Sequence, residues 1–169
     1  MATHRLSILD WHAKPGISGN CFPEPYTVKA TNDVWAHLHW IFNNTGAVRI
    51  VLYGAFEVPQ NYVGTAKVVI KWTTTATEGS AVWDFDYRAV GGDDAESLDQ
   101  AGTQESVTVT DAAPSATDEL MTVAIDLTSA NLAPGDTVEF LIARDLSEAA
   151  DDLAAAVQLV DLLFQYADA

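Results

Sequence analysis

The feature that most constrains the fold is a two-residue alternation of apolar and polar side chains. It is clearest in Val82-Trp83-Asp84-Phe85-Asp86-Tyr87-Arg88, where the three aromatic side chains fall on one side and the charged ones on the other. Successive side chains of an extended strand point to opposite faces. The segment is therefore predicted to be a half-buried β-strand with one apolar and one polar face.

Similar patterns recur along most of the chain. They predict strands at 34–42, 48–58, 66–73, 82–89, 105–110, 120–127 and 137–143. The last segment, 154–166, fits both a helix and a strand, and the seven strands before it favour a strand. About eight strands with mostly short connections predict an all-β protein, either a β-sandwich or a closed barrel.

Two of these segments are expected to pair as a hairpin. If Trp72 lies opposite Trp83, then Ile70 meets Phe85 on the apolar face. The same register places Lys71 opposite Asp84 on the polar face, and opposite charges in cross-strand pairs stabilise a sheet.

Residues 1–33 differ from the rest of the chain. Pro15 is followed by Gly16, and two prolines lie between Phe22 and Tyr26, which disfavours both a helix and a central strand. The segment is nevertheless too apolar for a solvated tail. We expect an irregular N-terminal arm at 1–33 that lies on its own domain or on a neighbouring subunit, followed by one domain at 34–169.

The charge distribution excludes several classes of partner. Residues 1–90 carry seven basic and seven acidic side chains, whereas residues 91–169 carry seventeen acids and one base, Arg144. This imbalance accounts for the net charge of −16. An acidic field repels nucleic acids and anionic membranes, so neither is expected as a partner.

The single cysteine, Cys21, excludes an internal disulfide and fits a protein that folds in a reducing cytosol. The N-terminus shows no apolar core of a signal peptide, and no apolar run is long enough to span a membrane.

No catalytic residue, metal site or cofactor is predicted, and the protein is not expected to be an enzyme. Asp84 and Asp86 share a strand face at a spacing that glycosidase carboxylates can have, but neighbouring carboxylates are common on polar strand faces. His37 and His39 also share a face and could chelate a metal, yet no third ligand is identifiable.

From Tyr53 onward the sequence resembles a family of jelly-roll capsid decoration (cement) proteins of tailed bacteriophages. The resemblance rests on short strand and turn motifs: 56–62, 69–73, 82–85, 132–136, 144–145 and 149–152. It implies a single jelly-roll-like β-sandwich that forms a homotrimer on the outer capsid surface of the virion. There it would bind the major capsid protein and stabilise the head.

The contacts with the capsid or with a sister subunit are expected in and next to the arm, at Leu6, Ile8, Leu9, Trp11, Ile17, Phe22, Tyr26, Trp35, His37 and His39. An alternative is a carbohydrate- or receptor-binding jelly-roll module of a phage tail fibre, which predicts exposed aromatic side chains. A hydrolase that uses Asp84 and Asp86 is a third hypothesis.

Overall fold

The computed structural model describes residues 1–6, 24–29, 36–92, 97–99 and 102–169, with the backbone alone for 24–29 and 36–38. All the regular structure in these residues is extended, apart from one short 3₁₀ turn, Ser129–Asn131 (η2). In this part of the chain no helix is long and apolar enough to cross a membrane.

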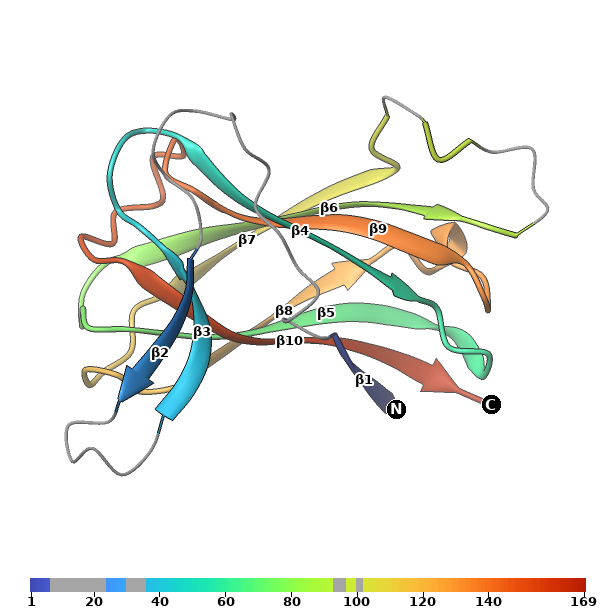
Figure 1. The fold of residues 1–169 in the computed structure, drawn as a ribbon, viewed down its shortest axis with the longest axis horizontal. Coiled ribbons are helices and arrows are strands. Elements are labelled where there is room, and N and C mark those ends of the chain that lie inside the picture. The colour runs from blue at the N-terminus through green and yellow to red at the C-terminus, as the bar shows by residue number, and fades with distance from the viewer. Residues whose placement is uncertain (7–23, 30–35, 93–96, 100–101) are drawn as a thin grey trace.

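The strands form two antiparallel sheets that pack face to face (Figure 1). Sheet A has the order β2-β3-β10-β5-β8, with β1 paired to β10, and sheet B has the order β4-β9-β6-β7. The strand bounds are β1 Ala2–Leu6, β2 Glu24–Lys29, β3 Ala36–Phe42, β4 Arg49–Glu57, β5 Tyr62–Thr74, β6 Ser80–Val90, β7 Glu105–Ala112, β8 Met121–Leu127, β9 Thr137–Asp145 and β10 Val157–Asp168.

The last eight strands have the connectivity of a jelly roll. Sheet β3-β10-β5-β8 faces sheet β4-β9-β6-β7, so that the chain passes back and forth between the two layers. This confirms the predicted all-β, jelly-roll-like sandwich, and each of the eight predicted strands is present. The ambiguous last segment is the strand β10, which lies in the middle of sheet A.

The core lies between the two sheets and is rich in aromatic rings. Phe85 stacks on Phe140 within sheet B, with ring centroids 5.3 Å apart, and Phe56 of sheet B contacts Phe164 of sheet A at 5.0 Å. Each of these rings is at most 8% exposed. The apolar side of the alternation is therefore the inner face of the sandwich, as predicted.

The predicted hairpin between 66–73 and 82–89 is wrong. β5 pairs with β10 and β8 in sheet A, whereas β6 pairs with β9 and β7 in sheet B. Trp72 and Trp83 do meet, but across the core, with ring centroids 6.0 Å apart in an edge-to-face arrangement. Lys71 is accordingly close to Asp161 on β10 (3.9 Å) rather than opposite Asp84.

The segment 1–33 is not irregular throughout, because it contributes β1 and β2. β1 pairs antiparallel with the end of β10, with Leu6 opposite Leu162. Leu6 is 2% exposed and belongs to the core of its own domain, which corrects its assignment as a capsid or subunit contact. A strand of five residues with one core side chain gives too weak an alternation to be detected in a sequence.

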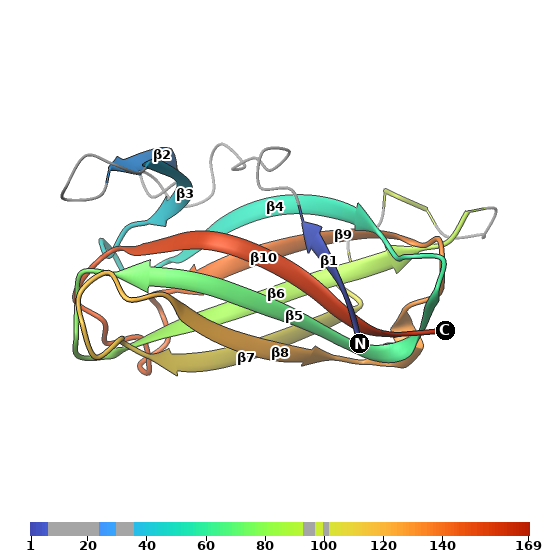
Figure 2. The same cartoon turned by 90° about the horizontal axis from the view of Figure 1, so that it is seen from below.

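β2 and β3 form a two-stranded ribbon that is only partly joined to the sandwich. All six residues of β2 pair with β3, but only Trp40–Phe42 of β3 pair with β10. Figure 2 shows the ribbon raised above one end of the two layers.

The same end of the sandwich is closed by the β9–β10 connection, which is fixed by the fully buried Arg144. Its guanidinium binds both carboxylate oxygens of Asp151 (2.7 and 3.0 Å) and donates to the carbonyls of Leu153 and Ala155. Both side chains of the Arg144–Asp151 pair are 0% exposed.

Candidate binding face

The outward side of sheet B carries an extended hydrogen-bonded group of charged and hydroxyl side chains, and we call it the sheet-B face. Four adjacent strands contribute to it, and at the usual strand spacing they span about 14 Å. The strand registers place these outward residues on it: Arg49, Val51, Tyr53, Ala55 and Glu57 on β4; Thr137, Glu139, Leu141, Ala143 and Asp145 on β9; Val82, Asp84, Asp86, Arg88 and Val90 on β6; Ser106, Thr108 and Thr110 on β7.

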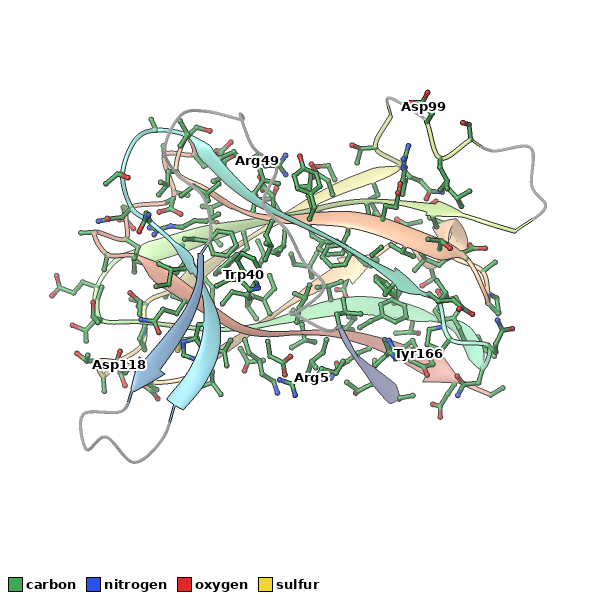
Figure 3. The ribbon with its side chains drawn as sticks, viewed as in Figure 1. Arg5, Trp40, Arg49, Asp99, Asp118 and Tyr166 are labelled. Atoms are coloured by element: carbon green, nitrogen blue, oxygen red, sulfur yellow. The ribbon has the colours of Figure 1, made fainter. Side chains whose placement is uncertain are left out.

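A hydrogen-bonded network occupies the middle of this face. Arg49, at the start of β4 (Figure 3), donates from Nε to Asp84 (2.7 Å) and from Nη1 to Asp86 (2.8 Å). On their other oxygens Asp84 accepts from Thr108 Oγ1 (2.7 Å) and Asp86 from Ser106 Oγ (2.5 Å). The network thus joins β4, β6 and β7 into one rigid polar surface.

The sheet register explains how Arg49 reaches β6. β4 and β6 are not neighbours, because β9 lies between them. At the level of Asp84 the intervening residue is Ala143, whose short side chain leaves room for the guanidinium to cross.

The electrostatics of the network favour the ionised form of both partners. Burial opposes the charge on Arg49, but the hydrogen bonds and the charges of Asp86 and Asp84 raise the pKa of this guanidinium above its ordinary value. Arg49 is therefore a fixed cation held by two carboxylates.

The same contacts argue against a hydrolytic role for Asp84 and Asp86. Only 7% of Asp84 and 8% of Asp86 is exposed, so the polar face of β6 is shielded from solvent at these two residues. A general acid and a nucleophile or base need access to substrate. Here each carboxylate oxygen already accepts a hydrogen bond from an arginine or a hydroxyl.

Around the network the face offers a mixture of apolar and hydroxyl groups. On β4 and β9, Tyr53 lies opposite Leu141, and both side chains are half-buried. On β7, Ser106, Thr108 and Thr110 are exposed. This combination of an aromatic ring with fixed polar groups is suited to the non-catalytic binding of a polar ligand.

Among the side chains that the structure describes, the exposed aromatic rings expected for a sugar-binding platform are scarce. The large apolar side chains that are strongly exposed in the described residues are Met1, Val63, Leu98 and Leu120. Trp72 and Trp83 are core residues, as predicted, and Trp40 is also buried, at 7% exposure.

Most of the predicted contact residues fall outside what the structure describes. Ile8, Leu9, Trp11, Ile17, Phe22 and Trp35 lie outside the described residues, and for Tyr26 and His37 only the backbone is described. His39 is 6% exposed, and its Nδ1 lies 2.8 Å from Gln158 Oε1 on β10. His39 therefore helps to join β3 to β10 and is a poor candidate for an external contact.

Within the described residues no group of three or more histidine, cysteine or acidic side chains is placed to hold a metal ion. Arg49 as the partner of Asp84 and Asp86 was missed at the level of sequence. The three residues are brought together through β9, and no local pattern records that arrangement.

A second polar cluster joins the two sheets where β7 meets β8. The Tyr87 hydroxyl donates to Glu105 Oε2 (2.5 Å), and the backbone N–H and hydroxyl of Thr128 donate to the same carboxylate (2.9 and 2.6 Å). Burial and the bond to Glu105 raise the pKa of Tyr87 well above its ordinary value. For Glu105 burial acts in the opposite direction, but the bonds from Thr128 and Tyr87 lower its pKa below 4.5.

Comparisons with known proteins agree with this architecture. No family profile matches the sequence, and no curated protein is similar to it in sequence. Among solved structures, a family 35 carbohydrate-binding module from Clostridium thermocellum superposes with a TM-score of 0.56 and 12% identity over 99% of this chain and 100% of that one. A family 11 carbohydrate-binding module from the same organism, in complex with a β-1,3-1,4-mixed-linked tetrasaccharide, gives 0.52 and 10% over 98% and 96%.

The fold also matches parts of larger proteins. An arabinose-bound α-L-arabinofuranosidase, MgGH51, superposes with a TM-score of 0.51 and 11% identity over 95% of this chain. This chain spans only 24% of the length of that enzyme. At these identities the likeness establishes the fold, a jelly-roll β-sandwich of the kind found in carbohydrate-binding modules.

Proposed function

We propose that this protein is a non-catalytic carbohydrate-binding module and that the sheet-B face is its binding surface. The observation that carries the proposal is the sandwich itself, which matches two carbohydrate-binding modules over nearly the whole of both chains. The sheet-B face adds a half-buried aromatic ring, exposed hydroxyls and a rigid charged network on adjacent strands.

Tyr53 is the side chain most suited to stack against a sugar ring. It is on the edge strand β4, and its register neighbour is the apolar Leu141 rather than a charge. An aromatic contact of this kind contributes about 1 kcal/mol beyond simple burial, which corresponds to a several-fold to ten-fold change in affinity.

The test is affinity gel electrophoresis against a panel of soluble polysaccharides. We expect at least one polymer to retard the protein, and we expect Tyr53→Ala to weaken that retention about ten-fold. Lys67→Ala is the control, because Lys67 is on β5 of the opposite sheet, where its side chain is about one-third exposed and pairs with Asp126. Retention that is equal in Tyr53→Ala and wild type, or absent for every polymer, contradicts the proposal.

A second candidate is the decoration of a bacteriophage capsid by a homotrimer, and the β2–β3 ribbon favours it. A two-stranded ribbon is marginally stable alone in water and gains stability when it lies on another surface. In the described residues β2 pairs only with β3, and residues 36–39 of β3 extend beyond the pairing with β10. Such a ribbon would suit a contact with a sister subunit or with the major capsid protein on the outer surface of the virion.

The oligomeric mass in solution tests this second candidate. Under it, light scattering gives a trimer for the wild type, and Val28→Pro gives a smaller species because proline removes a ladder donor from β2. The pairing of Trp40–Phe42 with β10 does not involve β2, so the sandwich itself should remain folded. A wild-type monomer contradicts the trimer.

A further inference from the structure

We infer that the sheet-B face selects neutral polysaccharides and rejects polyuronates and other polyanionic glycans. This inference rests on the carbohydrate-binding function proposed above. It follows from two properties of the face: its excess of acidic groups, and the engagement of both of its arginines with carboxylates of the same face.

The sheet-B face is acidic as a whole. Its outward positions hold two bases, Arg49 and Arg88, and five acids, Glu57, Asp84, Asp86, Glu139 and Asp145. An anionic polymer lying across the four strands would meet a net negative field. This local excess of acids is part of the net charge of −16 of the whole chain.

Both arginines of the face are already engaged. The bonds from Arg49 to Asp84 and Asp86 are 2.7 and 2.8 Å long, and the Arg49 side chain is 31% exposed. Arg88 donates from Nε to Glu139 (2.6 Å) and also binds the carbonyl of Leu98. A uronate carboxylate would have to displace a carboxylate of the protein to gain a bidentate contact with either guanidinium.

A neutral glycan needs no such exchange. Sugar hydroxyls both donate and accept, so they can bond the exposed hydroxyls of Ser106, Thr108 and Thr110. They can also donate to the accessible carboxylates of Glu57 and Glu139. A carboxylate or sulfate group only accepts, so it gains no hydrogen bond from the acidic oxygens of the face and lies close to a like charge.

The experiment compares polymers that share a backbone and differ in charge. Hydroxyethyl cellulose is set against carboxymethyl cellulose, and highly methyl-esterified homogalacturonan against polygalacturonate, together with neutral xylan, galactan and mixed-linkage β-glucan. We expect retention by one or more neutral polymers. For a backbone that binds, the anionic form should bind at least about ten-fold more weakly at low salt.

The variants separate charge selection from binding itself. Glu139→Gln removes an acid and the carboxylate partner of Arg88, so it should raise affinity for the anionic form of a polymer several-fold. Asp126→Asn also removes one acid, but Asp126 and its partner Lys67 are both in sheet A. This variant should leave the preference for the neutral form of a polymer unchanged.

Retention of polygalacturonate or carboxymethyl cellulose equal to or stronger than that of the neutral partner overturns the inference and leaves the proposed function standing. Absence of retention by any polymer overturns the proposed function, and the inference with it. A preference that responds equally to Glu139→Gln and Asp126→Asn also overturns the assignment to this face.

Discussion

Gly79 occupies a position where no other residue fits without strain. Its φ is +91°, and a Cβ there would lie 2.9 Å from Leu153 Cα and 3.0 Å from the Asp152 carbonyl oxygen. Because the obstacles are backbone atoms, the β9–β10 connection would have to move. We expect Gly79→Ala to lower the free energy of unfolding by about 2–4 kcal/mol in urea denaturation.

Gly92→Ala is the matched control for this substitution. A Cβ at Gly92 would meet nothing within 4 Å, so this change should stay within about 0.5 kcal/mol of the wild type. Equal stability of the two variants would show that the close approach at Gly79 is unimportant.

Arg144 holds the β9–β10 connection in place at one end of the sandwich. Its partner Asp151 is also fully buried, so Arg144→Met leaves an uncompensated negative charge in the protein interior. We expect a loss of about 3–5 kcal/mol in the free energy of unfolding, measured by urea denaturation.

Lys67→Met is the comparison for the buried pair. Lys67 is 2.8 Å from Asp126, but the aspartate is 80% exposed. Removing this ion pair should therefore lower the free energy of unfolding by only about 0–1 kcal/mol. A cost for Arg144→Met that is no larger than this would contradict the structural role of the Arg144–Asp151 pair.

At the scale of elements, Glu105 joins β7 of sheet B to the end of β8 in sheet A. Its pKa in the folded protein lies below the ordinary 4.5 because Thr128 and Tyr87 donate hydrogen bonds to the carboxylate. A group with a depressed folded pKa stabilises the fold above its unfolded pKa. That stabilisation is lost as the pH falls through the folded value.

Glu105→Gln should therefore destabilise the protein by roughly 1 kcal/mol at pH 7. The difference from the wild type should shrink as the pH falls below 4.5, as measured by urea denaturation over a pH series. Glu57→Gln, at an exposed position of β4, is the control for the loss of a surface carboxylate. If the difference in unfolding free energy between Glu105→Gln and the wild type stays constant from pH 7 to below pH 4.5, ionised Glu105 does not stabilise the fold through these hydrogen bonds.

The elements themselves were predicted better than their pairing. The alternation around Phe85 identifies a strand and its buried face, because the side-chain direction in a strand depends only on position along it. The same alternation is compatible with any apolar neighbour. Trp72 and Trp83 were therefore correctly placed on buried faces but wrongly placed on adjacent strands.

At the scale of the whole molecule, the two sheets share one core and should unfold together. Trp72 belongs to sheet A and Trp83 to sheet B, and their rings are in contact. We expect the urea transitions measured by tryptophan fluorescence and by far-UV circular dichroism to coincide. Two separate midpoints would show that the sheets are independently stable.

Local sequence patterns predicted the all-β fold class, the eight strands from residue 36 onward and the buried face of the strands around Ile70 and Phe85. These depend on local periodicity and on turn residues such as Gly135, which has the positive φ that a Pro-Gly turn requires.

Only the tertiary structure decided which strands are neighbours and which side chains form the sheet-B face. Arg49 meets Asp84 and Asp86 across β9, and Leu6 enters the core through β1. Both contacts join residues far apart in the chain. In a jelly roll the partner of a strand is set by packing two layers over one core, which no pattern within a single strand records.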